Sequence, residues 1–352
     1  MRKLWIILLA LFPLCATAQQ AVELKQQKLS KWGIGTANYS GIAPMGGNRY
    51  AVVSDKEPAD GFFVFSIDQD ANSGKIKDVY LEGFWGNPSP VTDAQGNSVR
   101  DCEDVAYFPL NNTLLIAGEG DQAIQEYRID GSLSGRGLQV PAICSLENIV
   151  PNLGFEALSY CPETKLFWTT TESTLPHDGL AAGPAHPDAQ NVLRLQSFRF
   201  DFSPAAQYAY RMDKGKSEDF GAIYVFGVPA VTALPDGKLL VLEREADISR
   251  GYLSSEVICK VFMVDPTNSW QIDSSIDLKT LDPNRFMVKT LIASFKTKYT
   301  PFVHKFANYE GMCLGRKLAD GRQTVLLISD SQANYGKGAF RLNDYIKVLI
   351  LP

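Results

Sequence analysis

A short pattern that returns along the chain constrains its fold more than any other feature. Each strong copy starts with a serine or a glutamate, passes through two apolar runs separated by a Gly/Asn/Asp turn, and ends on a carboxylate. The strong copies run from Ser40 to Asp55, Glu103 to Glu119, Glu156 to Glu172, and Glu310 to Asp330. A weaker copy leads from Val231 to Glu243 and Arg244. Internal repetition of this kind indicates a fold built from several similar units.

The runs within and after each copy have the composition of β-strands. They are short, rich in β-branched and aromatic residues, and bounded by Gly, Pro, Asn and Asp, as in 62–65, 113–116 and 238–242. A third strand follows each closing carboxylate, and a fourth often comes after it. The pattern therefore predicts an all-β fold, a β-propeller of four-stranded antiparallel blades. Five repeats are visible, and a sixth is possible between residues 265 and 300.

The two ends of the chain complement each other in this scheme. The last copy supplies only three strands before the chain ends at Pro352. The segment 22–31 is placed to add the missing outer strand. We therefore expect the N- and C-terminal strands to pair and to close the ring, which would leave fewer exposed sheet edges.

The first 18 residues have the features of a signal peptide. Arg2 and Lys3 precede the apolar run 4–14, and the small residues 16–18 form a cleavage site. We expect an exported protein, periplasmic or extracellular, whose residues 19–352 form a single domain. Lipid attachment at Cys15 is the second choice, because the bulky Leu14 precedes it. No later stretch is apolar for long enough to span a membrane.

Composition excludes some classes of function. The formal charge of −5 and the lack of a Lys/Arg run argue against a nucleic-acid partner. Five cysteines follow residue 18, so at least one thiol is unpaired, and no C-x-x-C motif or histidine cluster suggests zinc. No G-x-S-x-G motif suggests a nucleophilic serine.

Blade geometry brings the repeated carboxylates together. In a four-stranded blade, the start of the first strand and the end of the second strand lie on the same face of the propeller. The acids expected on this face are Glu103, Glu156 and Glu310 at first-strand starts and Asp55, Glu119, Glu172, Glu243 and Asp330 at second-strand ends. Like charges this close would repel unless a cation lay among them, and oxygen ligands suit calcium. The alternative is that each acid is a solvated turn residue.

A few other polar residues are candidates for this face. Arg244 and Arg250 flank the weaker copy and are expected to meet an anionic substrate, whereas Arg316 falls in a turn at the opposite end of its strand. His304 precedes the last copy and is a weaker candidate. Trp168 and Tyr309 are expected to be packing residues, since aromatic side chains on strands usually lie in the core.

The chain resembles the family known as esterase-like activity of phytase. The resemblance rests on segments in the expected order along nearly the whole mature chain, namely 39–42 with 53–55, 152–158 with 171–172, 234–244, and 308–312 with 318–322 and 327–330. It departs from the family pattern at Ala157, where glycine is usual. The resemblance implies a propeller with an acidic, calcium-dependent site that acts on an ester, by analogy a phosphate ester.

These observations give a leading hypothesis and an alternative. The leading one is a monomeric, secreted hydrolase of a small anionic ester, in which calcium neutralises the ester oxygens and activates a water molecule. The residues assigned to calcium are Glu103, Glu156, Glu310, Asp330, Asp55, Glu172 and Glu243. Glu310, Glu156 and Arg244 form the expected catalytic set. The alternative is a non-catalytic propeller that binds a ligand or a protein partner and holds a structural calcium.

Overall fold

A computed structural model describes residues 20–57, 59–96, 98–216, 220–249, 252–300, 303–332, 335–336 and 340–352. The signal peptide expected at 1–18, with Cys15, and the candidate Arg250 lie outside these residues. Within them the chain forms 23 β-strands and five short 3₁₀ helices. No helix of the described residues is long and apolar enough to cross a membrane.

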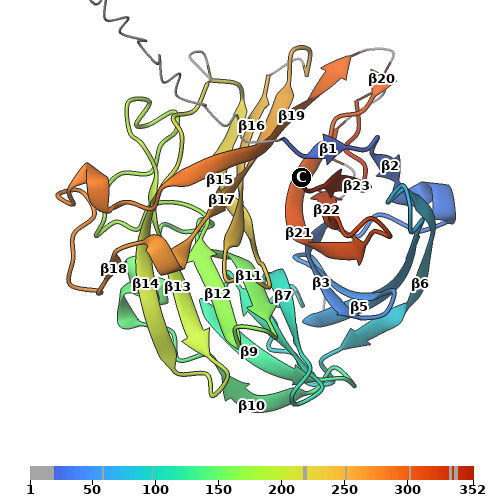
Figure 1. The fold of residues 1–352 in the computed structure, drawn as a ribbon, viewed down its shortest axis with the longest axis horizontal. Helices are drawn as coiled ribbons and strands as arrows, with labels where there is room; N and C mark the ends of the chain where they lie inside the picture. Colours follow the sequence, from blue (N-terminus) through green and yellow to red (C-terminus); the bar gives the residue numbers. More distant parts are fainter. Residues whose placement is uncertain are drawn as a thin grey trace, which may run out of the picture.

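The strands form five antiparallel sheets, which are the blades of a β-propeller (Figure 1). The first blade contains β3 (Tyr39–Gly46), β4 (Arg49–Ser54), β5 (Gly61–Gln69) and β6 (Ile76–Gly86). The second contains β7 (Cys102–Phe108), β8 (Thr113–Gly118), β9 (Ala123–Arg128) and β10 (Leu133–Gly137). The third contains β11 (Phe155–Cys161), β12 (Leu166–Thr171), β13 (Val192–Arg199), β14 (Pro204–Arg211) and the short β18 (Gln271–Ile272).

The last two blades use strands that are further apart in the chain. The fourth contains β15 (Ile223–Ala233), β16 (Leu239–Ile248), β17 (Glu256–Val264), β19 (Lys289–Thr300) and β20 (Val303–His304). The fifth contains β21 (Asn308–Lys317), β22 (Gln323–Asp330), β23 (Tyr345–Ile350), β1 (Val22–Glu23) and β2 (Gln27–Lys28). The short helices are η1 (Leu29–Trp32), η2 (Ala142–Cys144), η3 (Leu146–Asn148), η4 (Pro266–Asn268) and η5 (Pro283–Arg285).

The all-β propeller predicted from the sequence is confirmed, with five blades. The possible sixth blade does not form, because the segment 265–300 is divided between two others. Its β18 extends the third blade and its β19 is the fourth strand of the fourth blade. The innermost strands contact their neighbours in order, β3 with β7, β7 with β11, β11 with β15, β15 with β21, and β21 with β3.

Both ends of the chain contribute to the fifth blade. β1 pairs with β23 through Val22 and Ile350, and β2 pairs with the same strand through Gln27 and Ile346. The segment 22–28 therefore supplies the outer strand that the last repeat lacks. That this pairing keeps the ring closed stays a prediction.

The hydrophobic core lies between neighbouring blades. Ile116 of the second blade packs in one cluster with Val53 of the first, and Val241 of the fourth packs with Leu195 of the third. Strands buried on both faces explain why their sequences are nearly continuous apolar runs rather than alternating ones. Trp168 and Tyr309 are buried, as predicted. All five described cysteines are buried and unpaired.

Candidate functional site

A β-bulge at the same position of three innermost strands aims a glutamate at the axis. The strand register shifts between Cys102 and Asp104 in β7, between Phe155 and Ala157 in β11, and between Tyr309 and Gly311 in β21. The residues that these shifts leave without a partner are Glu103, Glu156 and Glu310. A bulge re-aims the side chain of its extra residue. In the first blade the corresponding bulge residue is Ser40.

The acids at the ends of the second strands follow from the same register. The residue that precedes each bulge pairs with the residue just before the acid, and the pairs are Tyr39–Ser54, Cys102–Gly118, Phe155–Thr171 and Tyr309–Ser329. The next residues are Asp55, Glu119, Glu172 and Asp330. Four blades therefore place an acid at equivalent positions of one face.

The fourth blade differs, and here the structure corrects the assignment of Glu243. Gly227, which precedes the bulge of β15, pairs with Arg244. Successive side chains of a strand point to opposite faces, so Glu243 and Arg244 cannot both face the axis. The carboxylate of Glu243 instead accepts a hydrogen bond from the Tyr210 hydroxyl at 2.7 Å and pairs with Lys289 Nζ at 2.5 Å. Glu243 is therefore not part of the acidic group.

The acids of this group other than Asp330 border one cavity of about 420 Å³. Its charged lining residues are Asp55, Lys56, Asp101, Glu103, Glu119, Glu156, Glu172, Arg244 and Glu310. Asp330 is fully buried, and its pKa is raised well above the usual range by burial and by the nearby carboxylates of Glu310 and Asp55. Asp101, which the repeated pattern did not predict, also lines the cavity; it precedes β7 and has a left-handed backbone (φ 52°), so strand alternation could not have placed it.

Two carboxylates of the cavity lack a polar partner. Glu103 is 7% exposed and Glu156 is 9% exposed. No described residue donates a hydrogen bond to either carboxylate or forms an ion pair with it. Burial and the surrounding carboxylates raise the pKa of both groups well above the usual range. Such groups must bind either protons or a cation.

The two cations that line the cavity within the described residues already pair with acids. Arg244 is 3% exposed and lies between two acids, with Nη1 at 2.5 Å from Glu310 Oε1 and Nη2 in contact with Glu172 Oε1. Asn308 joins this group, since its Nδ2 donates to Glu310 Oε1 at 2.7 Å. Lys56 Nζ pairs with Asp55 at 2.5 Å and with Asp101 at 3.0 Å. The sequence analysis did not single out Asn308 or Lys56.

Two further acids have pKa values near neutrality. Burial raises the pKa of Asp55 to about 6, against the opposing effect of Lys56. Burial also raises the pKa of Glu119 to about 7, although the backbone N–H of Gly154 donates to this carboxylate at 2.8 Å. The site therefore changes its proton content within the physiological range of pH.

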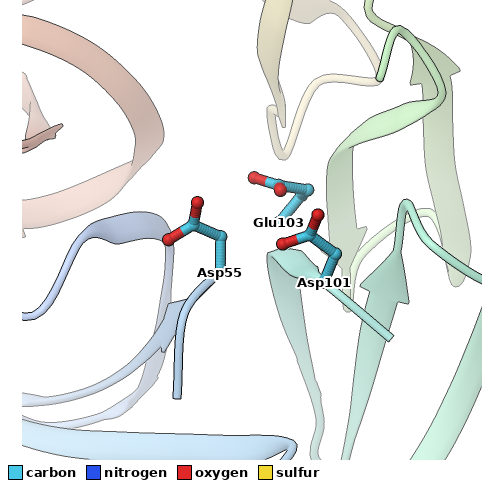
Figure 2. A group of neighbouring side chains, drawn as sticks. All are labelled: Asp55, Asp101 and Glu103. Carbon is cyan, nitrogen blue, oxygen red and sulfur yellow. The ribbon is translucent and has the colours of Figure 1, made fainter. Parts of the chain in front are cut away.

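Two overlapping groups of carboxylates could hold a metal ion. One consists of Asp55, Asp101 and Glu103, and the other of Glu103, Glu119 and Glu156, with the candidate ligand atoms of each group within 4.8 Å of one another. Figure 2 shows Asp55 of the first blade beside Asp101 and Glu103 of the second, whose carboxylates turn toward it. Asp55 Oδ1 is buried without a hydrogen-bond partner. This all-oxygen set, with partnerless buried atoms, fits a hard cation.

The other candidates lie elsewhere. His304 belongs to the short β20, but its side chain is outside the described part of the structure. Arg316 does not line the cavity and donates a backbone and a side-chain hydrogen bond to Gln69. The sequence predicted that Arg316 lies at the opposite end of its strand from the acids, and its position outside the cavity agrees with that prediction.

Comparison with solved structures identifies other propeller-like chains at low sequence identity. An endo-arabinase from Bacteroides thetaiotaomicron VPI-5482 is 11% identical, with a TM-score of 0.45, 91% of this chain covered and 95% of that chain. A streptogramin B lyase is 12% identical, with a TM-score of 0.37 and coverage of 93% and 97%. A gluconolactonase from Xanthomonas campestris is 12% identical, with a TM-score of 0.34 and coverage of 95% and 98%. Similarities this low bear on neither substrate nor chemistry.

Comparison with protein families gives a more extensive match. No curated protein matches the chain. The model of the phytase-like family, described as esterase-like activity of phytase, matches residues 34–332. The matched range begins before β3 and ends after β22, so it includes every acid of the cavity.

Proposed function

The chain belongs to the phytase-like family, and on this basis we propose that it is an ester hydrolase whose acidic cavity binds calcium. A phosphate ester is the favoured substrate, and a carboxyl ester is the second choice. The signal-like sequence at 1–18 supports a protein that is exported and acts outside the cytoplasm.

The observation that carries the proposal is the pair of partnerless carboxylates on the bulges of β7 and β11. Glu103 and Glu156 lie in a cavity whose described cations, Lys56 and Arg244, are already paired with other acids. Carboxylates arranged in this way favour a divalent cation with oxygen ligands, and Glu103 belongs to both candidate ligand groups. A bound calcium ion would supply positive charge beside the oxygens of the ester.

The side chains of the cavity divide the remaining tasks. Glu156 has no described partner, so its carboxylate is placed to accept a proton from water as the general base. Burial and the neighbouring carboxylates raise the pKa of Glu156 well above its usual range, so its ionised carboxylate is a stronger proton acceptor than a solvent-exposed glutamate. Arg244 forms ion pairs with Glu172 and Glu310. Its role in this proposal is therefore to hold Glu310 in position, not to contact the substrate.

The proposal is tested with purified protein, calcium, and p-nitrophenyl phosphate and p-nitrophenyl acetate as substrates. We expect release of p-nitrophenol that a chelator abolishes. The variant Glu156→Gln should lose at least about a hundredfold in kcat, the usual range for loss of a general base. Glu163→Gln is the matched control, since Glu163 is an exposed residue of the same blade that lies outside the cavity. Equal turnover in both variants would contradict the assignment of Glu156.

One observation favours a second candidate function, a binding protein with a structural calcium. Both cations that line the cavity in the described part of the chain already pair with acids, so an anionic substrate would have to compete with these acids for them. A calcium-dependent rise in the melting temperature without turnover of any ester would select this alternative. A rise together with turnover would select the hydrolase.

A further inference from the structure

The cavity has a second side with a different chemistry. The acids come from the first, second, third and fifth blades, whereas the fourth blade contributes mainly apolar side chains. These are Ile223 and Val225 of β15, Ala246 and Ile248 of β16, and Val257 of β17, which we call the apolar wall. β15, β16 and β17 lie side by side in one sheet (Figure 1). The cavity is therefore divided into an acidic side and an apolar side.

Strand register shows that the apolar wall is one continuous surface. Val225 pairs with Ala246, which pairs with Val257, and Ile223 pairs with Ile248. Directly paired residues point to the same face of a sheet, as do residues two apart in one strand. Ala246 and Ile248 therefore share the face of Arg244, and the wall continues directly from the residue that holds Glu310.

The polar residues of the same strand segment lie on the opposite face. Glu245 accepts a backbone hydrogen bond from Lys216, and Asp247 accepts one from Gly221. The alternation of acidic and apolar residues over 245–248 thus gives the apolar face to the cavity and the acidic face to Lys216 and Gly221. The apolar character of the wall is a property of the cavity side alone.

The wall rises beyond the acids because the fourth blade is longer. β4, β8 and β12 end one residue before their acids, at Ser54, Gly118 and Thr171. β16 continues from Arg244 to Ile248, which adds four residues, or about 13 Å of strand. A molecule whose polar group lies among the carboxylates must therefore extend along the wall as it leaves the cavity.

Part of the wall is open to the cavity rather than closed by packing. Val257, Ala246 and Ile248 are 1%, 5% and 9% exposed and belong to the core, but Ile223 is 38% exposed. Phe306 and Leu342 border the same cavity, and Tyr335, 40% exposed, lies at its edge. Apolar surface of this kind in a concave site is available to an apolar part of a ligand.

We propose that the substrate is amphipathic, with its ester group among the carboxylates and a hydrocarbon or aromatic group against the apolar wall. This inference rests on the proposed function and narrows it to a class of substrate. A polyol that carries several phosphates fits less well, because among the described residues the two lining cations already pair with acids and the apolar wall offers no polar side chain.

The test measures binding of methyl-, butyl- and hexylphosphonate to the calcium-loaded protein by calorimetry. Burial of each methylene against the wall is worth up to about fourfold in affinity, so we expect at least about a tenfold gain from methyl to hexyl. Ile223→Ser should reduce this gain severalfold. Ile129→Ser is the matched control, since Ile129 is also 38% exposed but lies away from the cavity, and it should keep the full gain.

The outcomes separate this inference from the proposed function. Three results would each overturn the proposal of an amphipathic substrate. They are an affinity that does not depend on chain length, a failure of all three phosphonates to bind, and an equal effect of the two serine variants. Chain-length-dependent binding without turnover of any ester would keep the amphipathic ligand but refute the hydrolase, so that the molecule bound there would be a ligand and not a substrate.

Discussion

At the scale of single residues, Glu103 is the side chain on which metal binding depends most. It is the carboxylate that the two candidate ligand groups share, and it has no hydrogen-bond donor among the described residues. Glu103→Gln keeps the shape of the side chain but removes its charge. We expect calcium affinity to fall at least about tenfold, measured by calorimetry, and the metal-free variant to be as stable as the parent or more stable, because one buried charge is gone.

Glu163→Gln is again the control for this substitution and should bind calcium like the parent. Unchanged calcium affinity in Glu103→Gln would show that the bulge glutamates do not form the metal site. A large loss of stability in the metal-free variant would show that Glu103 has a structural role instead.

The raised pKa values of Asp55 and Glu119 predict how stability depends on pH. Their pKa values rise from 3.8 to about 6 and from 4.5 to about 7 on folding. The folded protein therefore binds more protons than the unfolded chain between about pH 4 and 7, and stability is lost as the pH rises through this window. Without metal, we expect the melting temperature to fall by roughly 5 °C between pH 5 and 8.

Calcium should reverse this trend, because it binds the ionised carboxylates and competes with protons. The double variant Asp55→Asn, Glu119→Gln should show a flatter pH dependence when both proteins are metal-free. Thermal unfolding in metal-free buffers from pH 5 to 8, with and without added calcium, measures both effects. A melting temperature that rises with pH in the metal-free parent would contradict the assignment.

At the scale of elements, the sequence predicted the strands well but not the direction of every side chain. The spacing of the repeated pattern and the composition of its apolar runs predicted the two strands that flank each repeated acid. They therefore also predicted that Glu103, Glu156 and Glu310 converge. They could not show that Arg244 rather than Glu243 faces the cavity, because β16 continues past this point and strand alternation decides the direction. The positions of the bulges depend on the register between paired strands, and this register cannot be read from a single sequence.

The close approach of the innermost strands also depends on pairing. A Cβ on Gly41 would lie 2.5 Å from the Cα of Asp104 and 2.7 Å from the carbonyl oxygen of Glu103. Asp104 in turn accepts hydrogen bonds from the backbone N–H groups of Leu158 at 2.7 Å and Val105 at 2.8 Å. Glycine at position 41 therefore lets β3 pack directly on β7, next to the bulge that carries Glu103.

Gly41→Ala should force β3 and β7 apart. We expect it to destabilise the protein by about 2–3 kcal/mol, as overpacked substitutions do, and to weaken calcium binding through displacement of Glu103. Gly35→Ala is the control, since a Cβ at position 35 meets no atom within 4 Å. Urea unfolding of the two variants measures the difference, and equal stabilities would show that the strands can separate at no cost.

At the scale of the whole molecule, the ring combines repeated blades with one blade that differs. The repeat indicated five or six blades, and the structure has five because residues 265–300 add strands to existing blades instead of forming a new one. The apolar wall arises from the extra length of the fourth blade. This could not be predicted from the repeat, since the repeat describes what the blades share.

The fifth blade is completed by the start of the chain, and this pairing gives the last prediction. The Leu24 N–H donates to the carbonyl of Val348 at 2.9 Å, and β1 and β2 both pair with β23. Deletion of residues 20–28 would leave β23 as an unpaired edge, and such edges promote aggregation. We expect the deletion to lower the melting temperature by on the order of 10 °C and to increase association, measured by calorimetry and light scattering.

Leu24→Pro tests the same pairing without shortening the chain, because proline cannot donate the hydrogen bond to Val348. It should reproduce part of the loss in the melting temperature, whereas Gly35→Ala, beyond the paired segment, should not. A melting temperature unchanged in both the deletion and the proline variant would show that contacts between innermost strands, including those of β21 with β3, keep the ring closed by themselves.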